Sequence, residues 1–498
     1  MGKSLRAVAF PDVFVSSREM SRAVSAAVAD GRVRKITGRL YTSNIVDEPD
    51  VIVRRNLWRV VSLLVPGAVI SHRTAIEMRP AEDNSVFVTA GYNRRIELPG
   101  LNLRLLAGPG ALEGDTQLFD LHLASRARAL LEVLRPSRAR EGVARGLPRI
   151  KVEEVLEREM VAGGEPRLNE IRDQARRLVP QLDADAEFEL LNGIIGALLG
   201  TRQRVLTAPA AIARAAGEPY DAGRLERLQT LLAALRTLPV VSRPDERPTG
   251  AEFSNVSFFD AYFSNFIEGT RFQVGEAHEI IFDGRIPQSR PEDAHDVLGT
   301  YRLVGSRAFM NRSVLGFPNF DAFVEALRVA HAEILSARPD KRPGQFKDVA
   351  NIAGETTFVT PDLVRGTLRQ GFEITRSLDA PFQQSVAMMF VLSEIHPFDD
   401  GNGRIARAFM NAELISGGQT RILIPIVYRD DYLTGLRVLT RQGRAEPLIQ
   451  VLDFAHRYTA AIDFSDYENA LAALRATNAL EDSRPDVRLI MPRNASHR

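Results

Sequence analysis

Residues 396–407 read HPFDDGNGRIAR, and this stretch decides how the rest of the chain is interpreted. It sets a histidine, two adjacent aspartates, a Gly-Asn-Gly turn and two arginines within one short segment. The proline and the glycines break regular structure, whereas residues 382–395 before them are apolar nearly all round. After Arg404, apolar residues recur at helical spacing until Gly417-Gly418. The sequence therefore predicts a buried helix, a loop and a second helix.

A loop that leads into a helix N-terminus is suited to bind phosphate. Unpaired amides around Gly401, Asn402 and Gly403 are expected to point at an anion, aided by the positive end of the helix dipole. Arg404 and Arg407 lie three positions apart on one helical face. Each offers planar donors that match phosphate oxygens.

Two further side chains bring chemistry to this loop. A carboxylate beside phosphates is repulsive unless a cation lies between them, so Asp400 is predicted to hold Mg²⁺. His396 can be neutral near pH 7 and accept a proton from a hydroxyl. Phe398 is expected to anchor the loop in the core. Each residue alone has a structural explanation, because a lone histidine is more often structural than catalytic. Together they favour a triphosphate site.

HPFDDGNGRIAR resembles the Fic signature, HPF-x-[DE]-GN-[GK]-R-x-x-R, at every constrained position. The resemblance covers about residues 250–456 and implies an all-helical Fic fold. It further implies an enzyme that transfers AMP from ATP to a Ser, Thr or Tyr hydroxyl of a protein and releases pyrophosphate. By position, His396 is the implied general base and Asp400 the implied Mg²⁺ ligand.

The other matched positions are implied to bind the nucleotide. They are an anion hole of Gly401, Asn402 and Gly403, the phosphate ligands Arg404 and Arg407, and Asn411 near the nucleoside. The phosphorylating branch of the family has lysine where this chain has Gly403, so the glycine implies adenylylation. Residues 347–361 resemble the flap of the family, a hairpin that holds the target protein by strand addition. An ordinary surface hairpin is the alternative.

SNFIEG at residues 264–269 resembles the inhibitory pattern [ST]-x-x-x-E-[GN] of Fic proteins, with Ser264, Glu268 and Gly269 in place. The resemblance implies an autoinhibited enzyme in which Glu268 pairs bidentately with Arg407 and competes with the γ-phosphate. In some family members this glutamate also helps remove AMP, so reverse deAMPylation is open. Otherwise Glu268 is a surface carboxylate near a helix end.

The N-terminal region is basic. Residues 1–79 contain 13 Lys/Arg and 7 Asp/Glu, a net charge of +6 that is suited to a polyanion. A solvated basic face is the alternative on charge alone. Residues 16–43 predict a helix followed by a basic hairpin, the order found in a winged helix. The first 80 residues resemble the winged-helix module of AbiEi-type antitoxins. The expected DNA phosphate contacts are Arg18, Arg22, Arg32, Arg34, Lys35 and Arg39.

Composition bounds the remaining possibilities. The chain has 498 residues, 45% hydrophobic and 26% charged, with no cysteine. No apolar run approaches the roughly 18 residues of a membrane span, so we expect no membrane association and a cytoplasmic protein. We expect a mainly α chain with four parts. They are a winged-helix module at 1–80, a mixed α/β to helical region at 81–240, the Fic domain at 250–456, and a C-terminal helix with a loose tail at 457–498. Short strands are expected within 84–107, and the linker at 241–250.

Two functions remain open from sequence. One is an autoinhibited adenylyltransferase that uses ATP and Mg²⁺ and docks a target protein on its flap. The other is a DNA-binding transcriptional regulator of the toxin–antitoxin kind, whose Fic domain only senses nucleotide or modifies itself. A hydrolase that uses His396 is a weaker third interpretation, since the arginines and the glycine loop favour polyphosphate. Whether the protein forms a homodimer stays open.

Overall fold

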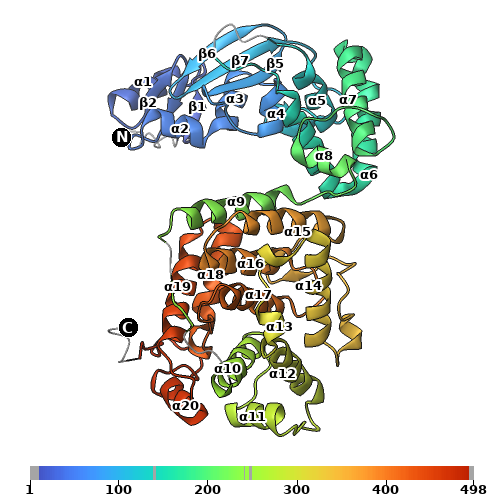
Figure 1. Ribbon diagram of the computed structural model, residues 1–498. Coiled ribbons are helices and arrows are strands. Elements are labelled where there is room, and N and C mark those ends of the chain that lie inside the picture. Colours follow the sequence, from blue (N-terminus) through green and yellow to red (C-terminus); the bar gives the residue numbers. More distant parts are fainter. Residues whose placement is uncertain (1–9, 138–141, 240–241, 246–249, 493–498) are drawn as a thin grey trace. The chain divides into compact units, whose positions relative to one another are not determined.

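The computed structural model of the chain describes residues 10–137, 142–239, 242–245 and 250–492. Most of these residues are helical, which confirms the expected mainly α class. They form two compact units, Met1–Ala216 and Gly217–Arg498 (Figure 1). The predicted linker 241–250 and the predicted tail lie partly outside the described residues. Among the described residues no helix has the length and apolar character needed to cross a membrane.

The N-terminal unit starts with the predicted helix and hairpin. Strands β2 (Arg34–Thr37) and β3 (Leu40–Thr42) form the hairpin, and β1 (Val13–Val15) completes the sheet in the order β1-β3-β2. Helix α1 (Ser21–Ala29) lies between β1 and β2 in the chain, and α2 (Pro49–Arg55) and α3 (Leu57–Leu64) follow. This order agrees with the expected local elements, whereas the winged-helix assignment itself stays a prediction.

A six-stranded mixed sheet follows in the same unit. Its strand order is β6-β7-β5-β4-β9-β8, and β5 runs parallel to β7. The strands expected within 84–107 are present as β5, β6 and β7. Alternate leucines of β7 are buried, as expected for a strand with one covered face. The strands are β4 (Val69–Ile70), β5 (Ser85–Ala90), β6 (Arg94–Leu98), β7 (Leu101–Ala107), β8 (Thr116–Leu118) and β9 (Leu121–Leu123).

Helices accompany this sheet and complete the unit. They are α4 (His72–Glu77), α5 (Arg126–Leu134), α6 (Arg149–Leu182), α7 (Asp185–Leu198) and α8 (Pro209–Ala215). Helix α6 contains a kink at Gly164, where the backbone leaves the helical conformation. Apolar side chains of α5, α6 and α7 form a core of their own.

The second unit is helical apart from one small hairpin. Its helices are α9 (Ala222–Arg236), α10 (Ala251–Ile267), α11 (Val274–Phe282), α12 (Pro291–Val304), α13 (Arg307–Met310), α14 (Phe320–Ile334), α15 (Pro361–Arg376), α16 (Pro381–Ile395), α17 (Asn402–Ser416), α18 (Arg429–Gln442), α19 (Glu446–Ala460) and α20 (Tyr467–Ala476). The hairpin consists of β10 (Ile352–Ala353) and β11 (Thr356–Thr357), inside the range expected for a flap.

Helices α16 and α17 form the centre of this unit (Figure 1). Nearly all their side chains are buried, which fits the apolar sequence of 382–395. Helix α9 packs on α15 and α16 through Leu228, Leu231 and Leu235. The boundary expected at residue 240 placed these residues in the preceding region. Their heptad-like spacing shows an apolar face, but sequence does not say which core that face covers.

Helices α12 and α14 approach each other closely at Gly299. A Cβ at this position would lie 2.7 Å from the carbonyl oxygens of both Glu333 and Ile334. Because these are backbone atoms on a packed helix, they have little freedom to move away. The missing side chain therefore fixes how α12 lies against α14, and both helices supply residues to the site described below.

We predict that Gly299→Ala lowers the free energy of unfolding by about 1–3 kcal/mol, since the added methyl overpacks this crossing. Urea unfolding measures the change. Gly275→Ala in α11 is the matched control, because a Cβ there meets no atom within 4 Å. The control should leave stability unchanged or raise it by up to about 1 kcal/mol. Equal effects of the two substitutions would contradict the close-approach explanation.

Candidate active site

The loop between α16 and α17 is closed by its own side chains. Asn402 accepts a hydrogen bond from the Phe398 amide at 2.9 Å and donates one to the Phe398 carbonyl at 2.8 Å. Phe398 is fully buried, as expected. Gly401 has φ +74°, a left-handed conformation that favours glycine. The side chain of Asn402 therefore shapes the loop, and its backbone begins α17.

His331 of α14 supports the backbone of this loop. Its Nδ1 accepts from the Gly344 amide at 2.9 Å, so its Nε2 carries the proton and donates to the Asp400 carbonyl at 3.0 Å. The ring also stacks on Phe398, with centroids 3.7 Å apart. Burial lowers the pKa of His331 to about 4, so the ring is neutral near pH 7. This residue positions the carbonyl that precedes Gly401.

The base of the hairpin segment holds the other side of the loop. The Lys347 amide donates to the Pro397 carbonyl at 2.9 Å, and Asn351 donates to the Phe398 carbonyl at 2.9 Å. The Lys347 ammonium is buried and donates to Asn351 at 2.7 Å. Burial lowers the pKa of Lys347 to about 8. The hairpin segment and the loop are therefore joined by several hydrogen bonds.

His396 has one ring nitrogen that can accept a proton. Its Nδ1 lies 3.2 Å from the Ser393 carbonyl, and because a carbonyl only accepts, Nδ1 carries the proton. The ring stacks against Phe358, with centroids 3.8 Å apart. Burial lowers the pKa of His396 to about 4, and the Lys347 cation acts in the same direction. Nε2 is thus unprotonated near pH 7 and able to accept a proton.

Asp400 has a partly exposed carboxylate, with 46% of its side chain accessible. One oxygen accepts from the Gly401 amide at 2.6 Å. Among the described residues, no group of three or more His, Asp or Glu side chains could hold a metal ion. Mg²⁺ at nucleotide sites commonly uses one or two carboxylates together with phosphates. Asp400 therefore fits a metal that arrives with a nucleotide. The adjacent Asp399 instead accepts from Nε and Nη2 of Arg342, at 2.7 and 2.9 Å, through its two carboxylate oxygens.

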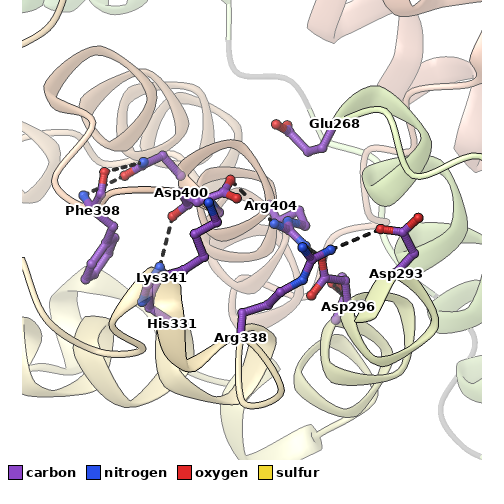
Figure 2. A network of polar contacts seen from close by, with 12 residues as sticks. Glu268, Asp293, Asp296, His331, Arg338, Lys341, Phe398, Asp400 and Arg404 are labelled. Atoms are coloured by element: carbon purple, nitrogen blue, oxygen red, sulfur yellow. Dashed lines mark hydrogen bonds and ion pairs between the residues drawn. The ribbon is translucent and has the colours of Figure 1, made fainter. Parts of the chain in front are cut away.

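Arg404 and Arg407 are both buried at the start of α17, each with 4% of the side chain exposed. Arg404 lies 2.9 Å from Asp296 and 3.7 Å from Asp400. Figure 2 shows these three residues together. Nε and Nη1 of Arg404 are buried and make no hydrogen bond among the described residues, so its contact with Asp296 is an ion pair. Two positive charges therefore lie beside the positive end of α17, where an anion is favoured.

Residues 264–269, the segment that the sequence predicts to be inhibitory, lie against Arg407. Ser264 accepts from the Arg407 Nε through its hydroxyl at 3.0 Å and from Nη2 through its carbonyl at 2.8 Å. Glu268 accepts from Nη2 at 2.7 Å. Burial acts to lower the pKa of Arg407, but Glu268 and Tyr432 together outweigh it, so the pKa is raised. The expected bidentate Glu268–Arg407 pair is wrong, because Ser264 binds Nε and shares Nη2, and Glu268 accepts one hydrogen bond, from Nη2.

Two glycines allow this contact in different ways. Gly269 has φ +96° immediately after Glu268, a backbone conformation that explains why the pattern requires Gly or Asn there. A Cβ at Gly403 would collide with the carboxylate of Glu268. The carboxylate therefore lies directly over the first turn of α17, where the sequence analysis expected phosphate.

Asn411 lies deeper in the fold than the other expected residues. It is fully buried, and its amide donates to Asp260 at 3.0 Å and to the Ile422 carbonyl at 3.1 Å. Its oxygen accepts from the Ile422 amide at 2.8 Å. The amide and the oxygen of its side chain thus join α17 to α10 and to the backbone of Ile422. Asn411 supports the helix, and its expected place near the nucleoside stays a prediction.

Sequence reasoning missed His331, Lys347 and Asp296. His331 is the one polar residue of the apolar face of α14, which also contains Leu327, Ala330 and Ile334. That signal was available, because a buried polar group needs partners. Lys347 and Asp296 gave no such signal, since lysine and aspartate are usually solvated and their partners lie far away in the chain.

We predict that the His396 ring titrates with a midpoint near pH 4, because its folded pKa lies below the ordinary 6.5. The ring should be neutral at pH 5.5 and above, and its contribution to stability should be lost as pH falls from 6.5 towards 4. NMR titration of ¹³C-labelled histidine, assigned with His396→Asn, measures the midpoint. A midpoint near 6.5 would contradict the buried free base.

Comparison with known proteins finds one family at this site. Residues 320–414 match the Fic/DOC family model. Protein adenylyltransferase fic-1 of Caenorhabditis elegans is 23% identical over 284 residues, which are 52% of this chain and 53% of that protein. Protein adenylyltransferase Fic of Aedes aegypti is 24% identical over 242 residues, 47% of this chain and 46% of that protein. The chain thus spans about half the length of the curated relatives it matches.

Among solved structures, Fic-1 (residues 134–508) from C. elegans is similar to this chain, with a TM-score of 0.36 and 18% identity. The similarity covers 66% of this chain and 90% of that one. The Fic/DOC match runs from the start of α14 into α17, and it contains His331, Lys347, His396 and both buried arginines. Helix α10 with Glu268 lies outside it.

Proposed function

We propose that the chain is an autoinhibited protein adenylyltransferase, which transfers AMP from ATP to a hydroxyl group of a target protein. The observation that carries this proposal is the juxtaposition of an unprotonated His396 Nε2 with a helix N-terminus that bears two buried arginines. A base beside an anion site is what phosphoryl or nucleotidyl transfer to a hydroxyl requires. The names of the matched relatives support the same reaction.

The chemistry follows from the positions of these groups. The triphosphate binds at the first turn of α17, where the amides of Asn402 and Gly403 and the two arginines offer donors. His396 Nε2 takes the proton of the target hydroxyl while the hydroxyl oxygen attacks the α-phosphorus. The bond from the α-phosphorus to the bridging oxygen breaks, and pyrophosphate leaves. Mg²⁺ held by Asp400 would neutralise charge on the phosphates.

The target protein docks on the hairpin of β10 and β11. Val349 and Ile352 expose 71% and 67% of their surface there, although both are apolar. Short strands with free edges accept an added strand, which fixes a hydroxyl with little demand on side chains. Because Lys347 and Asn351 tie this segment to the loop, a docked strand is held in register with His396.

Glu268 supplies the inhibition. Its carboxylate covers Gly403 and pairs with Arg407, so it competes with phosphate for the same donors. It has 31% of its side chain exposed and one hydrogen bond to Arg407, so this contact can be displaced. DeAMPylation is the hydrolytic removal of AMP, in which the oxygen of a water molecule attacks the phosphorus, AMP is released and the target side chain regains its hydroxyl proton. A partly exposed carboxylate at this point can hold that water molecule.

We predict that Glu268→Gly raises adenylylation at least tenfold, because Arg407 becomes free to bind phosphate. Incorporation of label from α-³²P-ATP with Mg²⁺ measures self-modification and modification of lysate proteins. Glu268→Gln should give an intermediate rate, since it keeps the shape and loses the charge. Adding His396→Ala to Glu268→Gly should lower the rate by about 10²–10⁴-fold, the usual contribution of a general base.

The outcomes separate the claims. Label that persists in the Glu268→Gly/His396→Ala double variant would overturn the role of His396 as base. An unchanged rate in Glu268→Gly, with unaltered thermal unfolding, would overturn the inhibition by Glu268. Absence of label in every variant would overturn the transfer reaction itself.

A second candidate function is DNA binding by residues 16–43, as in a toxin–antitoxin regulator. Three of the expected contacts are exposed and available to phosphate. They are Arg18 in the turn before α1, Arg22 in α1 and Lys35 in the hairpin. Three other expected contacts already have partners within the unit. Arg32 pairs with Asp30 at 3.1 Å, Arg39 donates to the Ser16 carbonyl at 2.9 Å, and Arg34 donates to the Asp47 carbonyl.

We predict that Arg22→Ala and Lys35→Ala each weaken binding to promoter DNA and reduce the salt slope by about one. Fluorescence anisotropy at several salt concentrations measures both quantities. Arg94→Ala removes an exposed charge from β6 of the same unit and should change neither. Equal effects of all three substitutions would show that DNA is attracted to the net charge of the unit and not to these residues.

A further inference from the structure

Asp296 of α12 lies beside the proposed phosphate site without being part of the loop or of the inhibitory segment. Its side chain has 4% exposure, and its Oδ2 lies 2.9 Å from Nη1 of Arg404. A buried guanidinium without a counter-charge is costly, and breaking a buried pair commonly costs several kcal/mol. Asp296 is the closest carboxylate to Arg404, since Asp400 is 3.7 Å away.

The same oxygen of Asp296 also accepts from Arg338, at 3.0 Å. Arg338 has two other carboxylate partners, Asp293 at 3.0 Å and Glu292 at 3.1 Å. Its charge is therefore balanced even without Asp296. For Arg404 the situation is different, because the alternative partner is Asp400, the carboxylate expected to hold the metal. Figure 2 shows Arg404 lying between Asp296 and Asp400.

The geometry leaves part of Arg404 available to a ligand. Nη1 forms an ion pair with Asp296 at 2.9 Å without a hydrogen bond, and the Nη2–Asp400 separation of 3.7 Å is too long for a strong hydrogen bond. Nε likewise has no acceptor among the described residues. A guanidinium held at one corner keeps a fixed orientation and can direct its other donors at a phosphate oxygen.

We propose that Asp296 is a positioning residue that holds Arg404 away from Asp400. This inference rests on the proposed nucleotide site and extends it to α12. With the charge of Asp296 removed, Arg404 moves towards Asp400 and closes the 3.7 Å gap. The phosphates then lose a preorganised donor, and the carboxylate that should bind Mg²⁺ is occupied by a cation. Both affinity for ATP and the magnesium requirement depend on Asp296.

The test measures binding by isothermal titration calorimetry, with Glu268→Gly as the background so that the inhibitory carboxylate is absent. Asp296→Asn should weaken Mg²⁺–ATP binding about tenfold, equivalent to about 1.4 kcal/mol. It should also raise the Mg²⁺ concentration that gives half-maximal ATP binding. Asp293→Asn is the matched control, because Asp293 lies on the same helix and pairs with Arg338 but is not paired with Arg404. It should change binding by less than twofold.

A double-mutant cycle tests whether Asp296 acts through Arg404. In an Arg404→Ala background, Asp296→Asn should have no further effect on ATP affinity, because the residue it positions is gone. Thermal unfolding of each variant identifies any loss of fold, and a structural role alone would weaken binding in both backgrounds. Additive effects, or equal effects of Asp293→Asn and Asp296→Asn, would overturn the proposal.

The outcomes also separate this inference from the proposed function. ATP binding with the predicted differences, but no transfer of label, supports the role of Asp296 and overturns the transfer reaction. Absence of ATP binding in every variant overturns both. Transfer that depends on His396 while Asp296→Asn binds ATP and Mg²⁺ normally overturns only the role of Asp296.

Discussion

Two buried positive charges, Arg404 and Arg407, set the constraint on which the C-terminal unit depends. They lie beside the positive end of α17, and each has little access to water. Such an arrangement is unfavourable unless anions surround it. The fold provides Asp296 for Arg404, and Ser264 with Glu268 for Arg407. The remaining donors are those to which we assign the triphosphate.

If Glu268 inhibits as we propose, this constraint implies that the inhibition can be released at a modest cost in free energy. Breaking a buried ion pair by removing one partner is expensive, but exchanging one anion for another is not. A phosphate that replaces the Glu268 carboxylate restores the charge balance of Arg407. The free energies of the two bound states therefore differ by far less than the free energy needed to break the Glu268–Arg407 ion pair. The single Glu268–Arg407 hydrogen bond keeps the difference small, and Ser264 keeps the guanidinium in place during the exchange.

The loop itself is held by groups that do no chemistry. His331 supports the Asp400 carbonyl from α14, and Lys347 and Asn351 support Pro397 and Phe398 from the hairpin segment. These bonds fix the backbone on both sides of the anion site, so its amides need not reorganise when a ligand binds. They also join the surface proposed for target docking to the residue proposed as base.

Sequence predicted the local parts of this site well. The glycines, the proline and the apolar periodicity determine the α16–loop–α17 arrangement, and SNFIEG lies where a carboxylate can reach α17. Sequence did not predict what the arginines contact, because Asp296 lies 108 positions before Arg404 and ordinary aspartates are solvated. The bidentate Glu268 pair was wrong for the same reason, since the Ser264 contacts depend on how α10 packs on α17.

The central claim is that the first turn of α17 holds the triphosphate in the place that Glu268 occupies. A crystal structure of Glu268→Gly with ATP and Mg²⁺ tests it most directly. The account predicts phosphate density within hydrogen-bond distance of the Gly403 amide, Arg404 and Arg407, with the α-phosphorus facing His396 Nε2. Nucleotide bound elsewhere in the unit, with both arginines still paired only to protein groups, would contradict it.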